Sequence, residues 1–165
     1  MENIIFTKGS GSQVSFEEMI KEIINFTKDK KFPYRVMIGT DSEIENNEVD
    51  FVSAVVVHRV GFGGKFYYRR WKKRGDSNSG EKFYLIYQRI WDEVLASVDL
   101  AQKLVEAFKK YKTNVNFELH VDVGYNGHTK DIIQEVVNYI RTYGLDVKVK
   151  PDSFVASKVA DRYVI

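Results

Sequence analysis

The stretch that decides the fold is residues 34–74, YRVMIGTDSEIENNEVDFVSAVVVHRVGFGGKFYYRRWKKR. It contains three runs rich in β-branched and aromatic residues, at positions 34–40, 49–60 and 65–74. The middle run is apolar on both faces, which is typical of a strand in the centre of a sheet. The tetrapeptide GFGG at residues 61–64 is a turn signal between the second and third runs. We therefore predict three consecutive strands, the last two joined as a hairpin.

Helical patterns surround this strand region. Upstream, Ser15 and Glu18 form a capping-box motif, and apolar residues at helical spacing predict a helix over residues 16–29, after a loose lead-in of thirteen residues. Downstream, the pattern predicts in order a helix over 81–110, a strand over 115–123, a helix over 129–143, a strand over 145–149 and a last short helix over 153–163.

The order of elements after the first helix is therefore β-β-β-α-β-α-β-α. It predicts an α/β fold with a five-stranded mixed sheet, right-handed crossovers, helices on both faces and an extra N-terminal helix. This order resembles the ribonuclease H-like arrangement. We expect residues 1–165 to form a single domain, in which residues 1–32 are the lead-in and the extra helix.

The composition excludes several classes of protein. Hydrophobic residues make up 44% and charged residues 29% of the chain, which is enough to build a core. There is no cysteine, so disulfides and thiolate zinc sites are excluded, which fits a reducing, cytoplasmic compartment. No apolar run approaches 18 residues and no signal peptide is visible, so we expect no membrane span. Because the net charge is only +2, any nucleic-acid binding must come from a local patch.

Three aspartates fall where this topology would bring them together. Asp41 follows the first predicted strand, Asp122 ends the fourth, and Asp161 lies on the last helix. In a ribonuclease H-like sheet the first and fourth strands are neighbours, and the final helix packs near their active ends. Taken singly, an aspartate after a strand is most often a turn former, and Asp161 could simply pair with Arg162.

A group of carboxylates in an apolar sheet edge favours a bound cation, because like charges repel and desolvation is costly. Carboxylate oxygens suit Mg²⁺ or Mn²⁺, and two such ions about 4 Å apart can activate water against a phosphodiester. We therefore predict that Asp41, Asp122 and Asp161 are metal ligands, with Asp41 bridging the metals.

A fourth acidic ligand is less defined. Glu93 lies on the flank of the apolar stripe of the helix over 81–110, so it could complete a second metal site. It could equally be an ordinary solvated helix residue. Glu43, close to Asp41, and Glu118, on the strand of Asp122, are weaker candidates.

Two histidines could assist proton transfer. His120 lies two residues before Asp122, on the same face of a predicted strand. His128 lies in a loop just before a predicted helix N-terminus, a place that suits anions. The alternative for each is a partly buried or capping histidine.

A basic segment could bind the nucleic-acid backbone. Five of six consecutive residues are cationic and one is aromatic: Arg69, Arg70, Trp71, Lys72, Lys73 and Arg74. Cations neutralise phosphates and aromatic faces stack on unpaired bases. The alternative is an edge strand that uses its charges against aggregation.

Three blocks of this sequence resemble the YkuK-type family of bacterial proteins, which is placed in the ribonuclease H-like superfamily. The blocks are IGTDS at 38–42, HVDVG at 120–124 with Gly127 and Thr129, and KPDSFVASKVADR at 150–162. The resemblance covers residues 14–163. It implies a ribonuclease H-like fold and a metal-dependent nuclease, with the acidic positions falling on Asp41, Asp122 and Asp161. No glutamate falls in a matched block.

The leading functional hypothesis is a Mg²⁺- or Mn²⁺-dependent nuclease that hydrolyses phosphodiester bonds of nucleic acid, RNA or DNA. The alternative is a non-catalytic nucleic-acid-binding or regulatory domain on the same fold, because a fold does not determine a function. A nucleotide-binding ATPase is disfavoured because no glycine loop of the Walker type is present.

Overall fold

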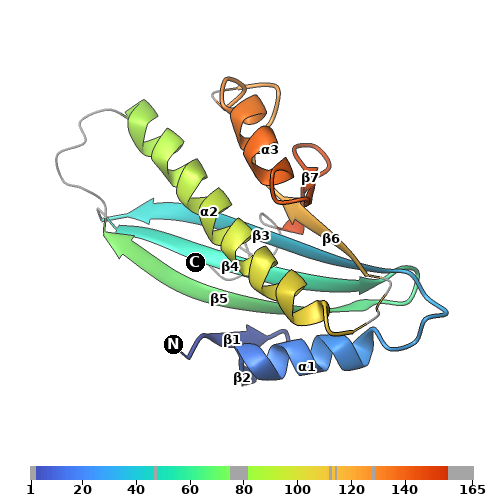
Figure 1. Cartoon of the computed structure of the whole chain (residues 1–165). Coiled ribbons are helices and arrows are strands. Elements are labelled where there is room, and N and C mark those ends of the chain that lie inside the picture. Colours follow the sequence, from blue (N-terminus) through green and yellow to red (C-terminus); the bar gives the residue numbers. More distant parts are fainter. Residues whose placement is uncertain are drawn as a thin grey trace.

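The three long strands of residues 34–74 lie side by side in the middle of one sheet in the computed structural model of this chain (Figure 1). The structure describes residues 3–46, 48–74, 82–111, 113, 115–127 and 129–155, with their side chains except those of residues 74 and 82–85. Within these residues the elements in chain order are β1 (Ile5–Lys8), β2 (Gln13–Ser15), α1 (Phe16–Phe26), β3 (Tyr34–Glu45), β4 (Glu48–Arg59), β5 (Gly64–Arg74), α2 (Lys82–Phe108), β6 (Val115–His120), α3 (Ile133–Arg141) and β7 (Asp146–Lys148).

The sheet has the strand order β2-β1-β5-β4-β3-β6-β7 and is mixed. β3, β4 and β5 form an antiparallel meander in which every residue from Tyr34 to Glu45 has a partner on β4. β6 pairs with β3 in parallel, and β7 pairs with β6 in parallel. Parallel neighbours need crossover connections, and α2 and α3 lie in these connections.

Glycines shape the predicted turn between β4 and β5. Gly61 and Gly63 have φ values of +85° and +84°, a conformation that L side chains rarely adopt. At Gly64, a Cβ atom would overlap the carbonyl oxygen of Val57. The GFGG sequence therefore matches the geometry of this hairpin.

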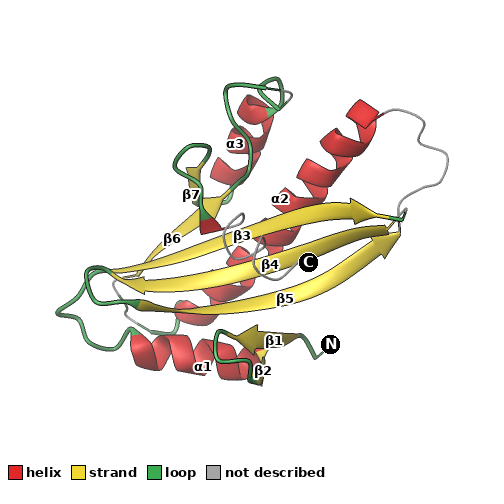
Figure 2. Cartoon of the chain, turned by 180° about the vertical axis from the view of Figure 1, so that it is seen from behind, coloured by secondary structure: helices red, strands yellow, loops and turns green. Residues whose placement is uncertain are grey.

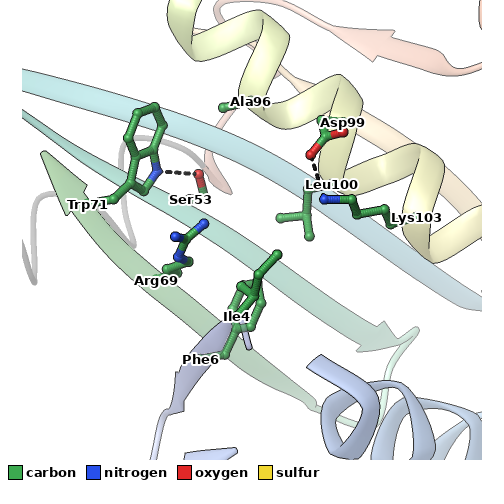
Figure 3. Close-up of a pocket in the computed structure, with 9 residues that line it drawn as sticks. All are labelled: Ile4, Phe6, Ser53, Arg69, Trp71, Ala96, Asp99, Leu100 and Lys103. Carbon is green, nitrogen blue, oxygen red and sulfur yellow. Dashed lines mark hydrogen bonds and ion pairs between the residues drawn. The ribbon is translucent and has the colours of Figure 1, made fainter. Parts of the chain in front are cut away.

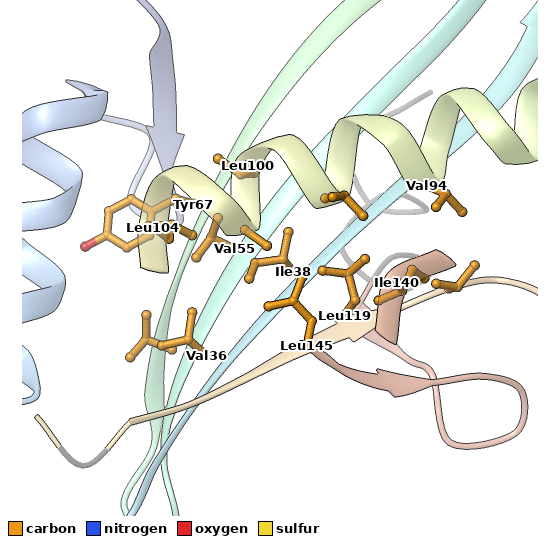
Figure 4. Close-up of a cluster of buried hydrophobic side chains, with 14 of the residues drawn as sticks. Val36, Ile38, Val55, Tyr67, Val94, Leu100, Leu104, Leu119, Ile140 and Leu145 are labelled. Carbon is orange, nitrogen blue, oxygen red and sulfur yellow. The ribbon is translucent and has the colours of Figure 1, made fainter. Parts of the chain in front are cut away.

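One face of the sheet carries the main core. Side chains alternate along each strand, so Val36 and Ile38 of β3 and Val55 of β4 point to the same face. α2 crosses this face diagonally, in front of the sheet in Figure 1 and behind it in Figure 2. Leu104 of α2 and Ile140 of α3 pack into the same cluster (Figure 4). Burying these side chains removes apolar surface from water and supplies the main drive for folding.

The helices begin and end close to their predicted positions. The predicted capping box of α1 is present: the Ser15 hydroxyl accepts a hydrogen bond from the backbone N–H of Glu18, and the Glu18 carboxylate accepts one from the N–H of Ser15. The helix ends at Phe26, three residues earlier than predicted. Among the described residues, no helix is both long and apolar enough to cross a lipid bilayer.

The prediction of five strands is wrong, because the sheet has seven. The five predicted strands are present, and β1 and β2 are additional. They form a short antiparallel pair within the predicted lead-in, and β1 also pairs with β5 at Thr7 and Lys8. Strands of three and four residues are too short to show a periodicity, and the partner that holds them is distant in sequence.

The described helices account for one of the two faces on which helices are expected. α1, α2 and α3 all contribute to the same core cluster, so the described helices lie on one face of the sheet. On the opposite face, Val155 packs against Met37 and Ala54. The predicted last helix, residues 153–163, lies outside the described residues beyond Val155.

Two strand boundaries change the position of candidate site residues. β3 continues five residues beyond the predicted end, so Asp41 lies inside this strand and does not follow it. Conversely, β6 ends at His120, so Asp122 lies two residues past the strand and not at its end. β3 continues because its partner β4 is equally long, a pairing that strand propensity in one run does not show.

Candidate active site

Asp41 is held in the centre of the sheet by backbone pairing. It lies opposite Val52 of β4, and its carboxylate accepts a hydrogen bond from the N–H of Ser42 at 2.9 Å. Because side chains alternate, Asp41 points to the face opposite α2, whereas Ser42 points toward the helix. The side chain of Asp41 is half-buried.

Asp122 lies on the segment that continues from β6, the neighbour of β3 in the sheet. Gly39 of β3 pairs in parallel with His120 of β6, and each aspartate comes two residues later on its segment. Val121 and Val123, on either side of Asp122, pack in the main core, so Asp122 is directed to the other face of the sheet, as Asp41 is. Hydrogen bonds from the N–H of Val121 to Lys148 and from the N–H of Lys150 to Val123 hold the Asp122 segment in place.

Lys150 supplies a positive charge to Asp122. Its Nζ atom lies 2.9 Å from Oδ1 of Asp122. Gly124 allows the two segments to approach, since a Cβ there would lie 3.2 Å from the Cβ of Lys150. The Lys150 side chain remains more than half exposed, so solvent screens this ion pair.

Glu93 is a buried carboxyl group on α2, only 7% exposed. Its Oε1 accepts a hydrogen bond of 2.5 Å from the Ser42 hydroxyl. Arg89, one helical turn earlier, donates to both the hydroxyl and the carbonyl oxygen of Ser42. These contacts fix the Glu93 side chain against β3.

Burial raises the pKa of Glu93 from its ordinary 4.5 to about 8, and the charges of Asp41 and Asp122 add to the rise. The Ser42 hydrogen bond and the Arg89 charge act in the opposite direction but are outweighed. Three carboxyl groups from β3, α2 and the segment after β6 are therefore within electrostatic reach of one another.

His120 is enclosed and serves as an anchor. It is 1% exposed, and burial holds its pKa below the ordinary value, so the imidazole is neutral. Nδ1 accepts a hydrogen bond from the N–H of Phe154, and Nε2 lies 3.4 Å from Glu118. The Phe154 ring packs edge-on against the imidazole. With both nitrogens engaged, His120 holds the C-terminal segment against the sheet.

Glu118 is occupied by Arg35. The guanidinium donates two hydrogen bonds to its carboxylate, at 2.6 and 2.7 Å. These bonds hold the pKa of Glu118 below the ordinary value despite burial. Glu118 is therefore a structural ion-pair partner across β3 and β6. Glu43, the other weak candidate, is exposed on β3.

Two predicted site residues, Asp161 and His128, lie outside the described residues. Within the described ranges, no three acidic, histidine or cysteine side chains form a group close enough to hold a metal ion. The donors that are present, on Asp41, Glu93 and Asp122, are all hard oxygen ligands of the kind that Mg²⁺ or Mn²⁺ prefers. The donor set fits such an ion in chemistry, and Asp161 would be a further ligand of the same kind.

The predicted basic segment is divided between the two faces of the sheet. Arg69, Trp71 and Lys73 point toward α2, because their β4 partners do so. Lys73 forms an ion pair of 3.1 Å with Asp92 of α2. The side chain of Arg74 lies outside the described residues.

On the other face, Arg70 and Lys72 approach the buried Asp50, and Lys72 also approaches Glu48. These two cations are partly neutralised by the protein itself. The six residues therefore do not form one continuous cationic surface.

Ser42, Arg89 and Lys150 are the polar partners of the site that sequence reasoning did not assign to it. The spacing of Arg89 four residues before Glu93 is a helical signal that could have linked the two. Nothing local links Lys150 to Asp122, since the contact depends on the pairing of distant segments.

The chain is similar to known proteins both in its family and over its whole length. A family model described as Ribonuclease H-like matches residues 18–164. The chain is 27% identical over 174 residues to the uncharacterized protein YkuK of Bacillus subtilis (strain 168), with 98% of each chain covered. No solved structure matches the chain significantly.

Proposed function

This chain belongs to the ribonuclease H-like family, and from that premise we propose that it is a divalent-metal-dependent nuclease acting on phosphodiester bonds of nucleic acid. The observation that carries the proposal is the buried Glu93 carboxyl, held near Asp41 and Asp122 with its pKa raised to about 8. Strongly perturbed acids with a defined charge partner are frequent at functional sites.

Mg²⁺ or Mn²⁺ would be held by Asp41 and Asp122, with Glu93 and Asp161 as further ligands. A bound cation would favour the ionised form of Glu93 and offset the repulsion among the carboxylates. When bound, such ions activate a water molecule and stabilise the leaving oxygen of a phosphodiester. Ser42 and Arg89 orient Glu93, and the pairing of β3 with β6 sets the spacing of the two aspartates.

The test is a Mg²⁺ and Mn²⁺ titration of the wild type, Asp41→Asn and the control Glu106→Gln. Glu106 is an exposed acid on α2 whose carboxylate pairs only with Lys109 among the described residues. We expect metal-dependent thermal stabilisation and cleavage of labelled RNA, DNA or hybrid substrates in the wild type and the control. Asp41→Asn should remain folded and lose cleavage by at least about a hundredfold, the scale typical of a lost catalytic group. Unchanged cleavage in this variant would refute the assignment.

A second candidate function is a non-catalytic nucleic-acid-binding domain. It is favoured by the way in which the carboxylates are neutralised: Lys150 pairs with Asp122, and Glu93 is largely protonated near neutral pH. Such a site is stable without a cation. Binding of nucleic acid that is unaffected by divalent metal, with no turnover, would support this candidate.

A further inference from the structure

The helix-facing side of the basic strand lines a cavity of about 220 Å³ (Figure 3). The cavity lies between β4, β5, α2 and the chain at and before β1. Its lining residues are Ile4, Phe6, Ser53, Arg69, Trp71, Ala96, Asp99, Leu100 and Lys103. It lies on the α2 side of the sheet, as Glu93 does, but Asp41, Glu93 and Asp122 are not among its lining residues.

An aromatic side chain with a fixed orientation forms one end of this cavity. The indole of Trp71 is stacked on Phe51, with ring centroids 4.1 Å apart and an interplanar angle of 7°. Its Nε1 donates a hydrogen bond to Ser53, whose hydroxyl also contacts Thr40. These contacts hold the half-buried ring in place before any ligand arrives, which lowers the entropy cost of binding.

The charges at the cavity favour an anion. The side chain of Arg69 has no hydrogen-bond or ion-pair partner in the part of the chain that the structure describes. Lys103 forms an ion pair with Asp99 at 3.0 Å, so the carboxylate is already neutralised. Two cations against one carboxylate leave the lining with one uncompensated positive charge, on a side chain that points into the cavity (Figure 3).

We propose that this cavity binds one nucleoside monophosphate unit, with the phosphate at Arg69 and Lys103 and the base against Trp71 and the apolar wall. The volume is below the roughly 300–1,000 Å³ of pockets for drug-sized ligands, which argues against a large cofactor. Aromatic rings stack on bases that are unpaired, so the polymeric ligand would be single-stranded. The proposal rests on the proposed function only in taking nucleic acid as the ligand.

The fluorescence of Trp71 provides the readout. The chain has two tryptophans, so Trp91→Phe leaves Trp71 as the single indole. The titration uses this variant with Asp41→Asn and a chelator, so that no metal-dependent cleavage contributes. The probes are a short deoxythymidine oligonucleotide, a duplex of equal length, and thymidine monophosphate.

We expect the single strand to quench Trp71 more strongly than the duplex, with an affinity that falls as salt rises. Arg69→Gln should weaken binding about tenfold and reduce the salt dependence by about one ion. Lys103→Gln gives a second test if Arg69→Gln fails to fold. Lys109→Gln, an equal charge change at an exposed site on the Phe108 end of α2, is the control and should bind as before.

The probes distinguish two possible ligands, a nucleic-acid strand and a free nucleotide. Quenching by the oligonucleotide assigns the cavity to a strand, and quenching by the monophosphate alone assigns it to a free nucleotide. No quenching by either, or equal weakening by Arg69→Gln and Lys72→Gln, overturns the proposal, because Lys72 lies on the other face.

If ligands bind at the cavity but the wild type cleaves no nucleic acid, the nuclease proposal is wrong and the cavity proposal is supported. If no ligand quenches Trp71 and substitutions at Arg69 and Trp71 leave cleavage unchanged, the cavity proposal is wrong and the nuclease proposal stands.

Discussion

Glu93 shows how one residue depends on its surroundings at this site. On an exposed helix surface it would be an ordinary acid, but here burial is the largest cause of its raised pKa. Its proton removes a charge that would otherwise be close to Asp41 and Asp122 in a poorly solvated place. The hydrogen bond from Ser42 and the charge of Arg89 lower the pKa of Glu93, but by less than burial raises it. Glu93 therefore keeps its proton at pH values at which an exposed glutamate is ionised.

Replacing Glu93 with glutamine should change how stability depends on pH. The folded-state pKa of about 8 lies above the ordinary 4.5, so the stabilisation linked to Glu93 is complete below pH 4.5 and is lost as pH rises to 8. A glutamine side chain at this position cannot ionise. We expect the free energy of unfolding of the wild type, relative to Glu93→Gln, to fall by a few kcal/mol at most across this window, at about 1.4 kcal/mol per pKa unit.

The measurement is urea unfolding of both proteins between pH 5 and 8.5 in the presence of a chelator. This pH range is chosen because the pKa of Glu93 in the folded protein is about 8. Glu106→Gln, at an exposed position, serves as the control and should follow the wild type at every pH. Parallel curves for the wild type and Glu93→Gln would show that Glu93 is ionised in the folded protein, contrary to this account.

At the scale of elements, the pairing of β3 with β6 determines where the two aspartates lie. The bidentate ion pair between Arg35 of β3 and Glu118 of β6 joins the two strands on the face of Asp41 and Asp122. Glu118 is only 2% exposed, so an unpaired charge there would be costly. His120 extends this network to Phe154 and so connects the sheet to the C-terminal segment.

Arg35→Met should therefore destabilise the protein at neutral pH by about 2–4 kcal/mol. Removing one partner of a buried pair costs about 3–5 kcal/mol, and the partial exposure of Arg35 reduces this cost. Because Arg35 holds the pKa of Glu118 below 4.5, the stabilisation is lost as pH falls, and the two proteins should converge in acid.

Thermal and urea unfolding at neutral and acid pH would measure both effects. Lys109→Met, which breaks an exposed ion pair at the C-terminal end of α2, is the matched control and should change stability by less than about 0.5 kcal/mol. An equally small effect of Arg35→Met would show that the ion pair is not what joins β3 and β6.

At the scale of the whole molecule, α2 connects the candidate active site to the core. Glu93 and Val94 are consecutive, yet one reaches the carboxylate site and the other packs among the apolar side chains. Further along the helix, Leu104 packs in the same cluster as Tyr67 of β5 and Leu119 of β6 (Figure 4). A loss of packing along α2 should therefore lower the stability of the molecule as a whole.

Leu104→Ala should destabilise the protein by about 2–5 kcal/mol, because it leaves a cavity in the core. Leu95→Ala on the same helix is the control: Leu104 is fully buried, whereas Leu95 is 47% exposed. The control should lose less than about 1 kcal/mol, as expected for truncation at a partly exposed site. Urea unfolding measures both, and similar losses would contradict the assignment of Leu104 to the core.

Local signals in the sequence were sufficient for much of the fold. The capping box at Ser15, the glycines of the β4–β5 turn and the apolar stripe of α2 each act through neighbours in the chain. The order of the long strands along the chain followed from these signals, whereas the adjacency of the segments that carry Asp41 and Asp122 was expected from the resemblance to the ribonuclease H-like arrangement. The strands β1 and β2 could not be predicted, because their pairing with distant residues stabilises them and their own composition does not.

The sequence by itself determined which residue types were available: carboxyl groups on or next to core elements, and one strand rich in cations. Only the tertiary structure decided what each of them does. Burial by distant side chains raised the pKa of Glu93, the approach of two segments brought Lys150 to Asp122, and pleating placed Arg69 and Arg70 on opposite faces of the sheet. Charge interactions and desolvation depend on distances in space, and those distances exist only after the chain has folded.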